Sequence, residues 1–113
     1  MSGRGEDAEN LAATFVQRAG LKLVARNYRC RFGEIDLIVR DGNTLVFVEV
    51  RMRSNDRFGG AAASITATKR AKLLRAARHY IANSALTPAC RFDALLVDGN
   101  DGAIEWLKNA FTE

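Results

Sequence analysis

Two acidic residues, Asp36 and Glu49, lie in strand-like segments at residues 33–40 and 44–52, on either side of a short turn. If Gly42-Asn43 forms a two-residue turn, Asp36 pairs directly with Glu49 across an antiparallel ladder. A two-residue turn placed one residue earlier makes the two acids diagonal neighbours on the same face. Only an odd-length loop without a bulge would separate them. The spacing therefore predicts two neighbouring carboxylates.

Such a pair indicates a cation, because like charges directly opposite each other destabilise a sheet. Glu49 lies within the apolar run LVFVEV, where an unpaired charge is costly. One or two carboxylates together with substrate phosphate oxygens are a common set of Mg²⁺ ligands. The alternative is that both acids are strand-end surface residues neutralised by nearby arginines. The same face is expected to carry Glu34, Arg51, Ile38, Leu45 and Phe47, and the opposite face Ile35, Leu37, Val39, Val46, Val48 and Val50.

Composition limits the class of protein. A chain of 113 residues, 48% hydrophobic and 27% charged, is typical of a single globular domain spanning residues 1–113, with a flexible tail at about residues 1–5. It has no apolar run long enough for a membrane helix and no secretory signal at its start, so we expect a cytoplasmic protein without a membrane partner. Its two cysteines, 60 positions apart, are expected to be reduced thiols.

Positive charge is concentrated in one part of the chain. Residues 51–78 carry eight Lys or Arg and one acid, a charge of +7, which leaves −3 for the rest because the whole chain carries +4. A basic face on a basic protein suits a polyanion such as nucleic acid. The alternative reading of this charge alone is a solvated helix surface.

The elements that must position these residues follow the order α-β-β-β-α-β-β. Apolar spacing predicts helices at residues 6–19 and 66–83. The second helix is expected to bury a stripe that is widened by Leu73 and Tyr80 and consists of Ala67, Ala71, Leu74, Ala77 and Ile81. The remaining strands are expected at residues 21–29, 91–98 and 103–107. A hairpin followed by a crossover helix predicts an α/β sandwich with a mixed central sheet flanked by helices.

The segments GEIDLI (residues 33–38) and FVEVR (residues 47–51) resemble the PD-(D/E)xK nuclease pattern. More closely, the chain resembles the YraN family of small bacterial proteins, which is similar to archaeal-type Holliday junction resolvases. Matching residues extend from Ala8-Glu9 through Phe58-Gly59 and Thr66 to Arg91-Phe92-Asp93 and Asn109-Ala110-Phe111. The resemblance implies a restriction-endonuclease-like three-layer sandwich.

The resemblance also implies roles for individual residues. Asp36 and Glu49 would bind Mg²⁺ or Mn²⁺, and Glu9 would be a helical acid that approaches the same catalytic site. Arg51 stands where such nucleases usually have a lysine; an arginine stays protonated and mainly clamps phosphate. Lys69, or less favourably Lys72, could supply a relocated amine. The residues expected to hold flanking DNA phosphates are Arg53, Arg57, Lys69, Lys72 and Arg75.

Three classes of function are compatible with this sequence. The first is a metal-dependent nuclease that cuts DNA, for which the resemblance implies branched or structured DNA. The second is a nuclease-fold protein that binds nucleic acid without cutting it, and the third is a protein-interaction module. Resolvase-like relatives also imply a homodimer, by analogy of fold alone.

Overall fold

The computed structural model describes residues 4–53, 66–83, 89–99 and 101–111. Its helices and strands follow the predicted order, with bounds within a few residues of those expected. The elements are α1 (Arg4–Arg18), β1 (Lys22–Cys30), β2 (Gly33–Asp41), β3 (Thr44–Arg53), α2 (Ala67–Ala82), β4 (Ala89–Asp98) and β5 (Ile104–Phe111).

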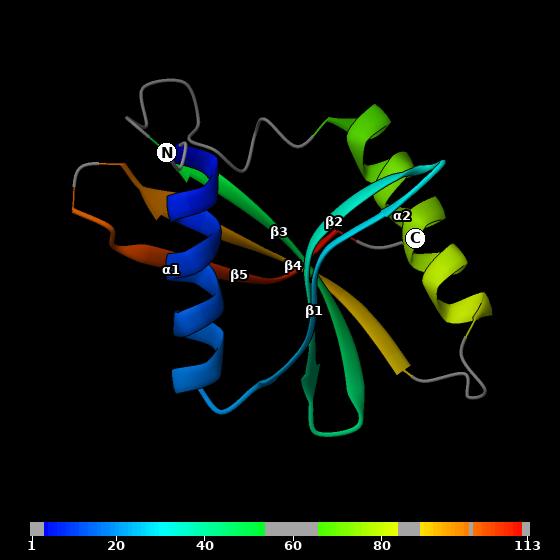
Figure 1. Cartoon of the computed structure of the whole chain (residues 1–113), viewed down its shortest axis with the longest axis horizontal. Coiled ribbons are helices and arrows are strands. Elements are labelled where there is room, and N and C mark those ends of the chain that lie inside the picture. Colours follow the sequence, from blue (N-terminus) through cyan, green and yellow to red (C-terminus); the bar gives the residue numbers. More distant parts are fainter. Residues whose placement is uncertain (1–3, 54–65, 84–88, 100, 112–113) are drawn as a thin grey trace.

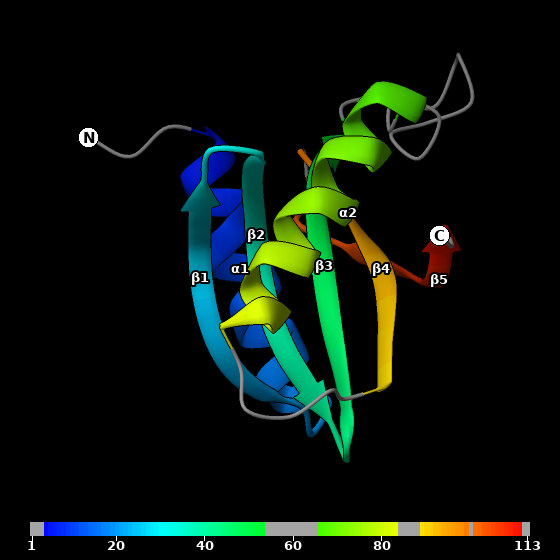
Figure 2. The same ribbon diagram turned by 90° about the vertical axis from the view of Figure 1, so that its right-hand side faces the viewer.

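The five strands form one sheet in the order β1-β2-β3-β4-β5, with α1 and α2 on opposite faces (Figures 1 and 2). All neighbouring strands are antiparallel except β3 and β4, which are parallel and are connected through α2. A parallel pair needs such a crossover because a tight turn reverses the chain and would make the second strand antiparallel to the first. The predicted α/β sandwich with a mixed central sheet is confirmed.

The register between β2 and β3 is the one predicted from a Gly42-Asn43 turn. Asp41 pairs with Thr44, and the ladder continues to Leu37 opposite Val48. Gly42 has a φ of +60°, which fits the first central position of a type II′ turn, where glycine is preferred. The next pair in this register would be Asp36 and Glu49.

The face of the sheet under α1 is apolar. Ala12, Ala13 and Val16 of the helix pack against four residues of the hairpin and one of β4: Leu37, Val39, Val46, Val48 and Leu95. Val50 packs against the edge of this cluster, as expected. The expectation for Ile35 was wrong: it packs in the cluster under α2, so strict alternation along β2 is broken near Asp36.

Helix α2 covers the other face through residues that agree only in part with the predicted set: Leu73 and Ala77 were predicted to be buried, and Ala76 was not. Its fully buried residues are Leu73, Ala76 and Ala77, which pack near Ile38 and Phe47. Ala67 and Ala71, predicted to be buried, are exposed, and Leu74 and Ile81 are half-buried. Several alanines around the helix left its orientation weakly determined by sequence. The observed orientation places Lys69, half-buried, on the side that faces the sheet.

The last strand is attached to the sheet by a buried carboxylate. Asp93 on β4 is fully buried and accepts hydrogen bonds from Trp106 Nε1 (2.8 Å) and from Asn109 N (3.0 Å). Arg91 Nε donates to the same carboxylate at 3.1 Å, while Arg91 Nη1 contacts Asp41 Oδ2 at 2.9 Å. Trp106 is therefore a packing residue, and its ring also lies edge-on to Phe15.

Among the described residues, no helix combines the length and apolar character needed to cross a bilayer. Within the described part of the chain, neither Cys30 nor Cys90 forms a disulfide.

Candidate metal centre

Strands β2 and β3 part at Asp36. Their register ends at Leu37 and Val48, beyond which β2 turns with β1 toward α2 while β3 continues in a different direction (Figure 1). At the point of divergence, Val50 N donates a hydrogen bond to Asp36 Oδ2 at 2.8 Å. In the register of this hairpin the backbone of Val50 would face that of Ile35. Where the ladder ends, the Asp36 carboxylate replaces a backbone carbonyl as the acceptor for the N–H of Val50. Asp36 is thereby fixed between the two strands.

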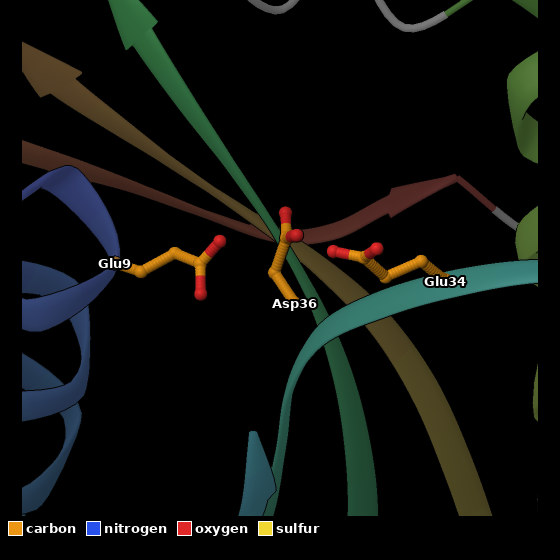
Figure 3. A group of neighbouring side chains, drawn as sticks. All are labelled: Glu9, Glu34 and Asp36. Atoms are coloured by element: carbon orange, nitrogen blue, oxygen red, sulfur yellow. The ribbon is translucent and has the colours of Figure 1, made fainter. Parts of the chain in front are cut away.

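Three carboxylates converge at this point. Glu9 of α1, Glu34 of β2 and Asp36 each offer an oxygen, and these three atoms lie within 4.8 Å of one another. Figure 3 shows Asp36 between the other two side chains, with Glu9 and Glu34 extending toward it from opposite sides. A cluster of carboxylate oxygens is the type of ligand set that Mg²⁺ and Mn²⁺ prefer. The group can hold a divalent cation.

Burial and neighbouring acids raise the pKa of Asp36 to about 8. Desolvation is the largest cause, followed by a hydrogen bond with Glu49 and by the charge of that residue. The bond from Val50 N acts in the opposite direction because it favours the ionised carboxylate. Without a cation, therefore, Asp36 holds a proton at neutral pH, and that proton belongs to the pair of acids.

Glu49 is the most deeply buried of the acids near the cluster, with 2% of its surface exposed. Lys69 Nζ lies 2.8 Å and Arg51 Nε 3.4 Å from its Oε2 atom. These contacts are ion pairs; within the described residues, neither Glu49 oxygen has a hydrogen-bond partner of good geometry when Asp36 is ionised. A proton on Asp36 supplies one such partner. The charge of the buried Glu49 is therefore balanced by the side chains of Lys69 and Arg51. The proton on Asp36 contributes as well, and a metal ion would replace that proton.

Glu9 reaches the cluster from the helix. Burial raises its pKa, a hydrogen bond from Asn27 lowers it, and the charge of Glu34 raises it. Asn27 lies on β1 with a φ of +52°, a conformation that asparagine tolerates better than most residues. The helical acid is thus held between β1 and the acidic residues of β2.

A pocket of about 290 Å³ opens beside the cluster, between the start of β2 and the first turns of α2. It joins one acid of the cluster to two lysines of the helix. Its lining residues are Gly33, Glu34, Thr66, Thr68, Lys69, Lys72 and Leu73. Thr66 caps the helix by accepting a hydrogen bond from Lys69 N through Oγ1 at 3.2 Å. The N-terminal end of a helix and two lysines make this pocket favourable for anions.

The structure brings together most of the residues that the sequence singled out. Glu9 and Asp36 belong to the acidic cluster, whereas Glu49, predicted as a metal ligand, lies beside it and pairs with Arg51 and Lys69. Lys72 lines the pocket and Arg75 is exposed on α2. The backbone of Arg53 ends β3, its side chain lies outside the described part of the chain, and so does all of Arg57.

Glu34 is the member of the cluster that sequence reasoning did not assign as a ligand. Its position two residues before Asp36, on the same strand face, was the available signal. Glu34 also forms an ion pair with Arg29 Nε at 3.0 Å, and that pair is exposed.

The raised pKa of Asp36 predicts how stability depends on pH. The folded protein keeps a proton that the unfolded chain, with a pKa near 3.8, has lost between about pH 4 and 8. Stability should therefore decrease as the pH rises through this range, by an amount on the order of a few kcal/mol. Asp36→Asn removes this titration and still offers an acceptor to Val50 N. Chemical denaturation of both proteins in chelator should give the variant the higher free energy of unfolding at pH 8.5.

At pH 4 the same two proteins should agree within about 1 kcal/mol, because Asp36 is then protonated in the folded state and only about half ionised in the unfolded chain, so that the difference in bound protons contributes little to stability. An equal dependence on pH in wild type and Asp36→Asn between pH 5 and 8 would contradict this assignment.

The amino-acid sequence of this chain matches a protein family and several related proteins. Residues 8–97 match a family model described as uncharacterised protein family UPF0102. The chain is similar to a UPF0102 protein of Nitrosomonas europaea, with 61% identity over 111 residues that cover 97% of this chain and 94% of the relative. It is also similar to a UPF0102 protein of Methylobacillus flagellatus, with 54% identity covering 99% of each chain.

Proposed function

This chain belongs to the uncharacterised protein family UPF0102, and from the geometry of its acidic residues we propose that it is a Mg²⁺- or Mn²⁺-dependent nuclease acting on DNA. The observation that carries this proposal is the convergence of Glu9, Glu34 and Asp36 at the point where β2 and β3 part. Like charges brought so close are costly without a counter-ion.

The reaction that this arrangement suits is hydrolysis of a phosphodiester. Glu9, Glu34 and Asp36 would hold a divalent ion, which would polarise a phosphoryl oxygen and lower the pKa of a water molecule. A new bond forms between the water oxygen and phosphorus, and one ester P–O bond breaks with its electron pair moving to the leaving oxygen. The water gives up one proton and the leaving oxygen gains one. The chain's own contribution is to hold the cation through the cluster and to hold the phosphate through Arg51 and the helix.

Phosphate-binding groups lie next to the acids. Lys69 and Lys72 line the pocket that also contains Glu34, so a phosphodiester at the cation has positive charge beside it. Arg75 lies farther along the same helix and is exposed. Contacts of this kind bind DNA with little sequence specificity and weaken as salt rises. The resemblance to Holliday junction resolvases favours branched DNA as the substrate and a homodimer as the active form.

A second candidate function is DNA binding without cleavage. The observation that favours it is that Lys69 and Arg51 already balance the charge of Glu49 without a metal ion. Phosphates would then be held by α2 alone, and affinity would fall steeply between low and moderate salt in the presence of chelator. The same affinity at both salt concentrations would favour a protein-interaction module instead.

The test is cleavage of labelled linear and four-way branched DNA by wild type and by Asp36→Ala, with Mg²⁺, Mn²⁺ or chelator. We expect cleavage that requires the metal and that falls at least roughly 100-fold in Asp36→Ala, because the cation contributes several kcal/mol to transition-state stabilisation. Glu105→Ala, which removes an exposed acid from β5, is the matched control and should cut like wild type. DNA binding without cleavage by wild type under all these conditions would favour the second candidate.

A further inference from the structure

The feature that carries a further inference is an irregularity of β1 beside α1. Ala25 and Tyr28 both pack in the cluster beneath α2, although they are three positions apart. In a regular strand, residues an odd number of positions apart lie on opposite faces. The two residues between them both contact α1: Arg26 Nη2 donates a hydrogen bond to a side-chain oxygen of the helix at 2.7 Å, and Asn27 donates one to Glu9. The strand therefore turns two consecutive side chains toward the helix that carries Glu9.

The backbone of Asn27 has the conformation that breaks the alternation. Its φ is +52°, in the left-handed region, whereas strand residues have a strongly negative φ. The pairs on both sides of this residue keep one continuous register, which places Asn27 opposite Asp36 on β2. Asn27 thus lies beside two members of the acidic cluster, Asp36 on the neighbouring strand and Glu9 on the helix.

Packing does not account for an asparagine at this position. Asn27 is exposed, so its side chain adds little to the core. Glycine would serve the backbone at least as well, because it adopts a positive φ without the steric cost that any side chain brings. The property that asparagine has and glycine lacks is an amide that donates hydrogen bonds. In this structure that amide contacts the carboxylate of Glu9.

We propose that Asn27 is a positioning residue of the metal centre, one that holds the Glu9 carboxylate in the orientation in which it binds the cation; this inference rests on the metal centre of the proposed function. Glu9 extends from α1 toward Asp36 on a side chain with several rotatable bonds (Figure 3). A hydrogen bond to the carboxylate restricts those bonds and leaves further lone pairs for a cation. Partners of this kind, which orient a ligand without touching the metal, typically contribute roughly 10–100-fold to metal affinity.

The experiment is calorimetric titration of Mn²⁺, without DNA, into wild type, Asn27→Gly and Asn109→Gly. Asn27→Gly removes the amide and permits the same backbone conformation, and it should bind Mn²⁺ roughly 10–100-fold more weakly. Asn109 is the matched control because it is the other non-glycine residue with a positive φ, +53°, in the described part of the chain, and it is exposed on β5. Asn109→Gly makes the same chemical change outside the acidic cluster and should bind within about threefold of wild type.

Two further measurements separate a positioning role from a structural one. Urea unfolding in chelator should give Asn27→Gly the same midpoint as wild type or a higher one, because glycine removes the cost of the positive φ. A structural role predicts instead that stability and Mn²⁺ affinity fall together. In the double variant Glu9→Ala/Asn27→Gly, the second change should cause no loss of affinity beyond that of Glu9→Ala, since an effect transmitted through Glu9 disappears with it.

Cleavage of labelled linear and branched DNA by the same proteins, over a range of Mn²⁺ concentrations, separates this inference from the proposed function. The Mn²⁺ concentration that gives half the maximal rate should rise in Asn27→Gly by a factor similar to the loss of affinity. If wild type cuts DNA and Asn27→Gly binds Mn²⁺ as tightly as wild type, the role of Asn27 is overturned and the proposed function stands.

A lower urea midpoint for Asn27→Gly, or losses of affinity that add in full in the double variant, would also overturn the positioning role. If Asn27→Gly loses affinity as expected and wild type cuts neither DNA, the nuclease is overturned and the positioning of Glu9 at a metal centre stands. Wild type that binds no Mn²⁺ would overturn both.

Discussion

Asp36→Asn is expected to lower the affinity of the protein for Mn²⁺ by more than the roughly 10–100-fold that is typical of losing an outer-shell partner. Asp36 is the central member of the acidic cluster and lies between Glu9 and Glu34 (Figure 3). It also forms a hydrogen bond with Glu49. The amide keeps the size of the side chain and an acceptor for Val50 N, so the loss reports on charge and coordination. Calorimetric titration of Mn²⁺ at pH 7.5 measures it directly.

The proton held by Asp36 gives this titration a second quantity to measure. Because its pKa is raised to about 8, cation binding at pH 7.5 should release a proton, and the apparent enthalpy should depend on the ionisation enthalpy of the buffer. Glu34→Gln should weaken binding less, since that acid is exposed and ion-paired with Arg29. Glu105→Gln is the control for a change of net charge. Equal Mn²⁺ affinity in wild type and Asp36→Asn would eliminate the acidic cluster as a metal site.

Asp93→Ala is expected to reduce the free energy of unfolding by about 3–5 kcal/mol, the cost of removing one partner of a buried charged pair. The substitution leaves the indole N–H of Trp106 and the amide of Asn109 without their acceptor. It also leaves Arg91 with Asp41 as the remaining acid that contacts it among the described residues. Since small domains are stable by only about 5–15 kcal/mol, this loss is a large fraction of the total.

Urea denaturation followed by the fluorescence of Trp106, the one tryptophan of the chain, gives both the stability and a local probe of β5. Asp41→Ala provides a close comparison, because it removes the other acid that pairs with Arg91. The side chain of Asp41 is 42% exposed. That change should cost no more than about 1 kcal/mol. A similar loss for the two variants would mean that burial of Asp93 does not determine its contribution.

The sequence by itself determined the order of the elements and limited the hairpin to two registers, of which the structure has the one with a Gly42-Asn43 turn. Both depend on local properties: apolar periodicity defines each helix or strand, and a two-residue turn with glycine first fixes which residues pair across it. The expectation that Asp36 and Glu49 belong together followed from that turn alone. The apolar cluster beneath α1 was largely predictable as well, since Leu37, Val39, Val46 and Val48 alternate within two strands.

Tertiary structure decided which other residues join the acids. Glu9 reaches Asp36 from another element 27 positions earlier in the chain, and Lys69 contacts Glu49 from a helix 20 positions later. Such meetings depend on how each helix is rotated on the sheet, and the alanine-rich α2 is compatible with more than one rotation. The buried set Leu73, Ala76 and Ala77, in which Ala76 replaces the predicted Ala67 and Ala71, turns Lys69 toward the sheet.

The point at which β2 and β3 part could not be predicted from the periodicity of the sequence either. It arises where β2 bends with β1 toward α2, which moves Ile35 into the cluster beneath that helix and brings Glu34 to Asp36. The alternation of side chains between the two faces assumes a straight strand. Here β2 is not straight, because it packs against two helices on opposite faces of the sheet. Local residue chemistry thus fixed one pair of acids, whereas the packing of both helices built the charged environment around it.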